Sequence, residues 1–202
     1  MVFTGRRTVG QPAGESHPVH QQREVLIDRA AAICYNQKKN MGGTNMNIWD
    51  KAQSVQLRVS ETIEPGFDIG FDPKIPLETQ REMRSFVQWV EDKYNLPITL
   101  WVDFEYRHYL ISREGKRVGY LFYWADFSDY PVFNNPEDIP VIRLPVRTEH
   151  STIEEILSSF IEAISDYFMW ICNGMHEGYN ADENDVEEIL QAYLCSRVAE
   201  LK

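Results

Sequence analysis

ITLWVDFEY, residues 98–106, is the stretch that decides how this chain folds. Apolar side chains occupy every second position, and Thr, Trp, Asp and Glu occupy the positions between them. A period of two is typical of a β-strand with one face buried against a core. We therefore expect a strand here, whose other face carries Trp101, Asp103 and Glu105.

The residues before this stretch predict two further strands and a helix. Residues 55–59 and 67–71 show the same alternation, and a Pro-Gly pair lies between them, so a turn should join the two strands. Apolar side chains then recur at helical spacing over residues 79–94. Thr79, followed three residues later by Glu82, has the pattern of a capping box, which predicts that the helix starts there.

The residues after this stretch predict a hairpin and an edge strand. Residues 108–112 and 117–124 flank a short turn that contains glycine, as in a β-hairpin. Residues 139–146 are apolar enough for a strand. However, Pro140 and Pro145 cannot donate hydrogen bonds to a neighbouring strand, so we expect this segment at the edge of a sheet.

Two amphipathic helices are expected at the end of the chain. The first should begin at Ser151, with Glu154 completing a capping box, and end at Asn173-Gly174, and the second should span residues 182–201. Short turns between most strands favour antiparallel pairing. The predicted fold class is α+β, with a mainly antiparallel sheet of about five to six strands covered by about three helices.

Charge divides the chain near residue 46. Residues 1–45 contain six Lys and Arg against three Asp and Glu, which gives 6 − 3 = +3, whereas the whole chain has a net charge of −11. We interpret 1–45 as a basic, polar N-terminal extension with a possible short helix and 46–202 as a single domain. Residues 149–202 alone have two basic and twelve acidic residues, or 2 − 12 = −10. Such a charge attracts basic protein surfaces and repels nucleic acid.

Five carboxylates gather where the last helix should begin. They are Asp182, Glu183, Asp185, Glu187 and Glu188. Acidic residues in the first turn of a helix stabilise its dipole, which is the simpler explanation of this cluster. The alternative is a partner-binding surface, because the preceding helix is acidic too and two like-charged neighbouring helices repel each other.

Aromatic residues provide a second group of candidate contacts. Trp101 belongs to the polar face of its strand, where it either anchors a partner or is covered by another layer. The loop over residues 126–133 mixes acids with aromatics, and Phe127, Asp129 and Tyr130 suit contact with a basic protein. A carboxylate metal site is a further alternative, because Mg²⁺ and Mn²⁺ prefer oxygen ligands. Its candidate ligands are Asp68, Asp72, Asp103 and Glu105.

Other observations limit the classes of function. The chain has no zinc-ligand spacing, phosphate-binding loop or Ser-His-Asp order, so we expect no cofactor and lean against an enzyme. Three cysteines without a CxxC pair favour a reduced, cytoplasmic setting, and the apolar runs are too short for a membrane span. The leading hypothesis is a small inhibitor-like or antidote-like module that binds a basic protein. The alternatives are a metal-dependent, nuclease-like hydrolase using Asp103 and Glu105, and an accessory protein that self-associates as a homodimer through its sheet face.

Overall fold

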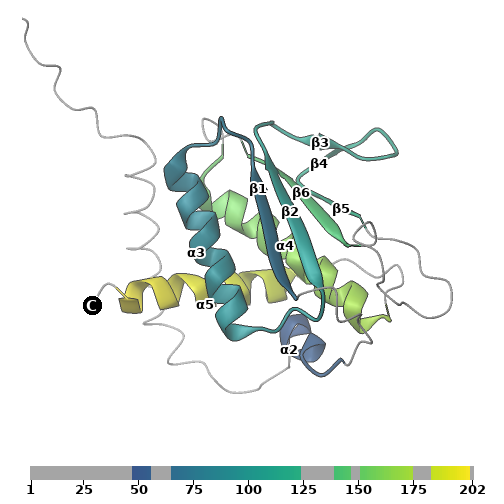
Figure 1. Cartoon of the computed structure of the whole chain (residues 1–202), viewed down its shortest axis with the longest axis vertical. Helices are drawn as coiled ribbons and strands as arrows, with labels where there is room; N and C mark the ends of the chain where they lie inside the picture. The colour runs from purple at the N-terminus through teal and green to yellow at the C-terminus, as the bar shows by residue number, and fades with distance from the viewer. Residues whose placement is uncertain (1–46, 56–64, 124–138, 147–150, 175–182, 201–202) are drawn as a thin grey trace, which may run out of the picture.

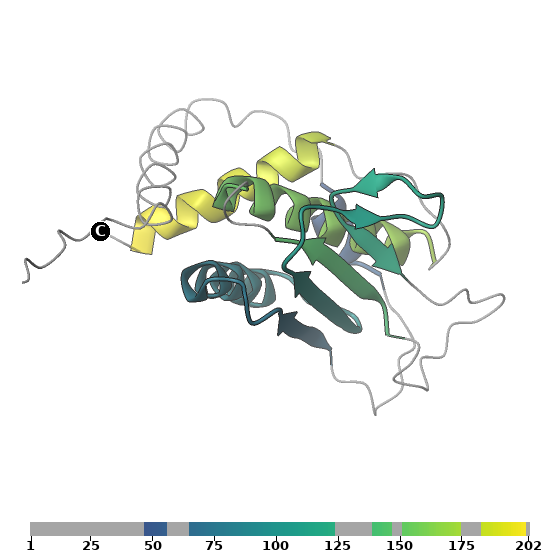
Figure 2. The ribbon, with the colours of Figure 1, turned by 90° about the horizontal axis from the view of Figure 1, so that it is seen from above.

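The computed structural model describes residues 47–55, 65–123, 139–146, 151–174 and 183–200 (Figure 1). Four strands form one sheet, and two short strands form a second sheet beside it. The helices gather on one side of the four-stranded sheet (Figure 2). In chain order, the elements are α2 (Ile48–Ala52), β1 (Gly66–Phe71), α3 (Leu77–Lys93), β2 (Thr99–Glu105), β3 (Leu110–Ile111), β4 (Arg117–Val118), β5 (Leu121–Tyr123), β6 (Val141–Pro145), α4 (Ile153–Cys172) and α5 (Glu183–Glu200).

The four-stranded sheet is mixed, so the prediction of a mainly antiparallel sheet with five to six strands is wrong. Its order is β1-β2-β6-β5. β1 pairs with β2 and β2 with β6 in parallel, and only β5 runs antiparallel, to β6. The reason is that α3 carries the chain back along the sheet between β1 and β2, and a strand that follows such a crossover is parallel to the first.

β6 lies inside the sheet, so the prediction of an edge strand is also wrong. Its two prolines are tolerated for different reasons. Pro140 precedes the strand and contributes its carbonyl, which accepts a hydrogen bond from the Trp101 backbone N–H at 3.0 Å. The nitrogen of Pro145 faces the side of β5, but β5 pairs only with residues 141–143, so no ladder hydrogen bond is lost there.

The segment predicted as one strand over residues 117–124 divides into two. β4 pairs with β3 as the expected hairpin, whose turn contains Gly115 with φ +76°. After Gly119 and Tyr120 the chain joins the main sheet as β5. Of the strand predicted at 55–59, only Val55 belongs to the described residues, and it is not in a strand.

The ends of the helices differ from the predicted ones by one or two residues. α3 begins at Leu77 after Pro76, and Thr79 is buried inside the helix rather than capping it. α4 begins with a capping box made by Thr152 and Glu155, one residue later than expected. Two overlapping S/T-x-x-E patterns occur here. The register is decided by burial of the apolar side chains that follow.

The core lies between the sheet and the helices and is rich in aromatic side chains. Phe160 of α4 contacts Phe104 of β2 at a ring distance of 5.1 Å and Phe86 of α3 at 5.4 Å. Trp49 of α2 is fully buried and donates a hydrogen bond to the Ser165 hydroxyl at 2.7 Å. α5 packs on this layer, where Tyr193 contacts Phe86. In the described part of the chain, no helix combines the length and apolar character that a membrane crossing requires.

Candidate functional site

The face of the sheet opposite the helices is not covered by any element that the structure describes (Figure 2). This open face confirms the predicted orientation of β2: residues 100, 102 and 104 are buried, and Trp101 is 44% exposed. Cross-strand register then places side chains of four strands in rows. One row contains Asp68, Trp101, Val141 and Tyr123, and the next contains Gly70, Asp103, Arg143 and Leu121.

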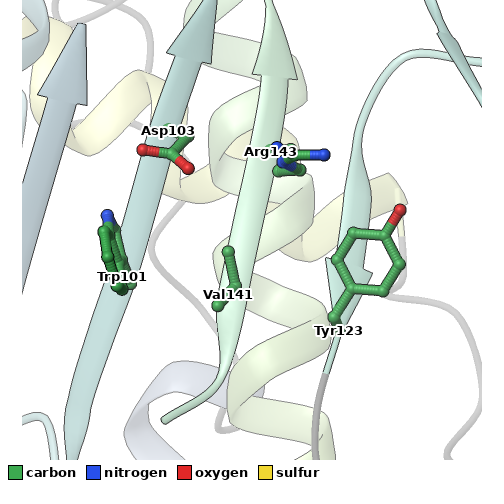
Figure 3. Close-up of a pocket in the computed structure, with 5 residues that line it drawn as sticks. All are labelled: Trp101, Asp103, Tyr123, Val141 and Arg143. Carbon is green, nitrogen blue, oxygen red and sulfur yellow. The ribbon is translucent and has the colours of Figure 1, made fainter. Parts of the chain in front are cut away.

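A shallow depression of about 340 Å³ lies in the middle of the open face. Its lining residues are Trp101, Asp103, Tyr123, Val141 and Arg143 (Figure 3). Figure 3 shows the rings of Trp101 and Tyr123 on either side of Val141. The depression is therefore bounded by two aromatic side chains from different strands, with an aliphatic side chain between them.

Carboxylates on the open face fall into two kinds. Glu105 is flanked by two arginines: Arg107 Nε lies 2.9 Å from its Oε2, and Arg143 Nε lies 3.1 Å from its Oε1. The second contact is an ion pair without hydrogen-bond alignment, because Oε1 has no hydrogen-bond donor. Asp68 and Asp103, by contrast, make no hydrogen bond or ion pair within the described residues. They are the two unpaired anions beside Trp101.

Gly70 explains how the Asp103 carboxylate is placed. A Cβ atom at position 70 would lie 2.7 Å from Asp103 Oδ1, which is closer than van der Waals contact permits. The glycine thus leaves the room in which this carboxylate rests over β1. Sequence reasoning did not identify Gly70, although a glycine in the middle of a strand often marks a close approach of another group.

The structure does not assemble the predicted carboxylate metal site. Asp72 lies in the turn after β1, where it accepts a hydrogen bond from the Lys74 backbone N–H at 2.9 Å. Glu105 is occupied by its two arginines. Within the described ranges, no three His, Cys, Asp or Glu side chains lie close enough together to hold a metal ion. The four candidate ligands therefore do not converge: Asp72 lies in the turn after β1, Glu105 pairs with two arginines, and Asp68 and Asp103 lie beside Trp101.

α5 lies on the helix side of the sheet (Figures 1 and 2), whereas Trp101 belongs to the opposite, open face. Asp185 Oδ2 accepts a hydrogen bond from the Ile48 backbone N–H at 3.0 Å, and Glu188 Oε1 accepts one from the Asn47 side chain at 3.0 Å. These two carboxylates therefore fasten α2 to α5. Glu187 is exposed and accepts from Gln191 of its own helix.

Four other predicted contact residues cannot be placed. Phe127, Asp129, Tyr130 and Asp182 lie outside the described residues, as does the side chain of Glu183. The predicted partner-binding residues that the structure does describe therefore fall on two separate surfaces. One is the open face around Trp101, and the other is the start of α5.

Both C-terminal helices are strongly acidic. α4 and α5 pack against each other and together contain nine Asp and Glu and one basic residue, Arg197, so their net charge is 1 − 9 = −8. Arg197 pairs with Glu82 of α3, at 3.6 Å. Asp166 of α4 accepts a hydrogen bond from the Tyr120 hydroxyl at 2.6 Å. A bond from a neutral donor leaves the negative charge of the carboxylate in place.

Comparison with models of known protein families, with curated proteins and with solved structures finds no match to this chain. The function of this chain is therefore inferred from its open face and its acidic helices.

Proposed function

We propose that this protein is a binding module that engages a basic protein surface through the open face of its sheet. The observation that carries the proposal is the exposed Trp101, with the unpaired carboxylates of Asp68 and Asp103 beside it. Tryptophan is among the residues that contribute most to binding energy in protein interfaces. The two carboxylates add charge complementarity to a basic partner.

Long-range charge supports the same class of partner. The chain has a net charge of −11, of which α4 and α5 contribute −8. These helices lie behind the sheet, so they act on a partner at the open face through their field and not through contact. Such a field speeds the approach of a cationic surface and weakens as ionic strength rises.

A basic partner suits the open face better than a second copy of the same chain does. In a symmetric dimer the same patch faces itself. In a dimer whose two-fold axis passes near Asp68 and Asp103, these residues of one copy would approach the same residues of the other, and like charges brought together at an interface are unfavourable. A basic protein meets no such repulsion.

A catalytic role for this depression has less support than a role in protein binding. The side chains that line the depression include one carboxylate, one guanidinium and one phenol. Among the described residues, this lining has no hydroxyl or thiol nucleophile next to a histidine base, which is the arrangement that nucleophilic catalysis requires. The depression is also shallow, whereas small-molecule sites are usually enclosed clefts.

Affinity capture from a native lysate tests the proposal. We expect the wild-type protein to retain a basic partner at low salt, to lose most of it at high salt, and to lose it at either salt when Trp101→Ala is introduced. The matched control is Leu77→Ala, because Leu77 is 67% exposed but lies at the start of α3. A captured protein that is retained equally by both variants would contradict a role for the open face.

The captured partner should then be purified and titrated against each variant. Removal of an aromatic anchor commonly costs about 2 kcal/mol or more, which corresponds to a roughly thirtyfold weaker Kd. The Asp68→Asn, Asp103→Asn double variant should bind more weakly and show a smaller dependence on salt than the wild type.

A further inference from the structure

We infer that the shallow depression between Trp101 and Tyr123, called the slot below, receives a single arginine side chain of the partner, stacked on Trp101 and paired with Asp103. This inference rests on the proposed function, because it names the chemical group that the open face recognises. Three features favour it: the exposed ring of Trp101, the unpaired carboxylates beside it and the position of Gly70.

Trp101 provides the aromatic surface of the slot on which a planar group can stack. Trp101, Val141 and Tyr123 are cross-strand neighbours on three adjacent strands, β2, β6 and β5. Neighbouring strands lie about 4.8 Å apart, so the two aromatic side chains start about 10 Å from each other. Figure 3 shows the Trp101 ring edge-on and the Tyr123 ring face-on, so the two rings do not face each other and a planar group can stack on Trp101 alone. Val141 forms the floor between the rings (Figure 3).

The charges beside the slot favour a cation. Asp103 lies two residues from Trp101 on β2, and Asp68 is the cross-strand partner of Trp101 on β1. Neither carboxylate has a hydrogen bond or ion pair in the described part of the chain. A cation over the ring of Trp101 would therefore interact with both the aromatic face and a nearby anion.

Of the described residues that line the slot, Arg143 is the one cation, and its guanidinium is already paired. Its Nε lies 3.1 Å from Glu105 Oε1, toward the end of the strands. Because Arg107 shares the same carboxylate, Glu105 offsets only part of the charge of the two arginines, but the pairing keeps the Arg143 guanidinium next to Glu105. Arg143 is the cross-strand neighbour of Asp103, but the Asp103 carboxylate lies over Gly70 of β1, so the side of the slot toward β1, where Asp68 also lies, is the negative side.

Arginine satisfies these requirements better than lysine. Its guanidinium is planar, so it can stack on an aromatic ring while its N–H groups form two parallel hydrogen bonds to one carboxylate. A lysine ammonium is a compact charge that pairs with a carboxylate but has no planar surface to stack. The combination of a ring, a slot and an adjacent carboxylate therefore selects the guanidinium.

Gly70 acts as a positioning residue for this contact. Because a Cβ atom there would lie 2.7 Å from Asp103 Oδ1, Gly70→Ala must displace the carboxylate from its present position. We expect Gly70→Ala to weaken arginine binding while the number of charges on the open face stays the same. Its thermal stability, measured in parallel, reports whether the strand itself is disturbed.

Titration with short peptides tests the inference directly. The probes are acetyl-Gly-Ser-Arg-Gly-Ser-amide and the same peptide with lysine or with uncharged citrulline in place of arginine. The readout is the indole N–H resonance of Trp101 in isotopically labelled protein, assigned with Trp101→Phe. The arginine peptide should shift this resonance with a Kd on the order of 1 mM, and the citrulline peptide should bind at least about tenfold more weakly. The lysine peptide should lie between them.

Charge-matched variants separate the local contact from the general field. Asp103→Asn should weaken the arginine peptide by about tenfold, which is the effect of one charge-assisted pair. Asp92→Asn removes the same charge from an exposed position on α3 and should change Kd by less than about twofold. Equal effects of the two variants, or equal binding of the arginine and citrulline peptides, would overturn the inference.

The two proposals can fail separately. If the arginine peptide leaves the Trp101 resonance unchanged while capture of the partner still depends on Trp101, the arginine slot is wrong and the binding face stands. If the peptide binds as expected but capture is indifferent to Trp101→Ala, the proposed function is wrong.

Discussion

The two sides of the four-stranded sheet hold carboxylates in contrasting situations. On the helix side, Asp185 and Glu188 accept hydrogen bonds from α2, and Asp166 accepts one from Tyr120. On the open side, Asp68 and Asp103 have no such partner among the described residues. Carboxylates of the same type thus hold the fold together in one region and remain available to a partner in the other.

The same contrast divides the side chains of one strand. Phe104 of β2 is buried and stacks on Phe71 at a ring distance of 4.7 Å. Three residues earlier, Trp101 faces outward and is 44% exposed. Substitutions on the helix side should therefore change stability, and substitutions on the open side should change binding. The following measurements test this division.

Alkaline pH should have the largest effect, because it acts on several phenols of the helix side together. Burial raises the pKa of Tyr94, Tyr120 and Tyr167 above the ordinary value of 10.0, and nearby carboxylates raise the first two further. A group whose pKa is raised in the folded state contributes stability that is fully present below its unfolded pKa. This contribution is lost as the pH rises toward the folded pKa. Above pH 10, the free energy of unfolding should fall by about 1.4 kcal/mol per pH unit for each tyrosine that ionises only when unfolded.

Phenolate absorbance followed alongside circular dichroism would check this pH dependence. We expect part of the tyrosine signal to appear only together with loss of secondary structure. Tyr167→Phe should make the alkaline loss of stability shallower, because it removes a phenol whose pKa is raised by burial. Complete ionisation of all ten tyrosines in a protein that stays folded would contradict the raised pKa of the buried tyrosines.

Phe104→Ala should have the next largest effect. Its ring is 1% exposed and contacts Phe160 at 5.1 Å as well as Phe71, so its removal leaves a cavity between sheet and helices. Urea denaturation should show a loss of about 3–5 kcal/mol. Trp101→Ala removes a larger side chain and should cost no more than about 1 kcal/mol, because it lies at the surface. Equal losses would mean that Trp101 is part of a core and not of an open face.

Asp185→Ala should produce a smaller loss, confined to stability. The substitution leaves the Ile48 backbone N–H at the start of α2 without its 3.0 Å acceptor. Loss of an interaction of this capping kind costs about 0.5–2 kcal/mol. Glu187→Gln, two residues later in the same helix, keeps an acceptor for Gln191, so it serves as the control and should change stability by less than about 0.5 kcal/mol. Both variants should retain binding at the open face. A selective loss of binding in Asp185→Ala would contradict the separation of stability on the helix side from binding on the open side.

Much of the candidate site could be predicted because it depends on local alternation. The period of two in β2 placed Trp101, Asp103 and Glu105 on one face, and the structure confirms this. What could not be predicted are contacts between strands that are distant in sequence. The pairing of Glu105 with Arg143 and the space that Gly70 leaves for Asp103 both follow from cross-strand register. No periodicity within a single segment contains that information.

The acidic residues of α5 are a second case in which a contact between distant segments could not be predicted. The cluster was expected either to stabilise its own helix or to face a partner. In the structure, Asp185 and Glu188 instead bind the start of α2, 137 and 141 residues away in the chain. Such a contact cannot be predicted from either segment alone, because it depends on how the fold brings the two segments together.

The amino-acid sequence by itself determined where the main strands and helices lie and which side chains of β2 face outward, because these depend on propensity and periodicity among neighbouring residues. The tertiary structure alone decided that β1, β2 and β6 run parallel, that β6 lies inside the sheet, and that the acidic helices lie behind the face that carries Trp101. The physical reason is that strand order and direction follow from how the helices cover one side of the sheet. That packing depends on apolar surfaces contributed by every part of the described chain at once.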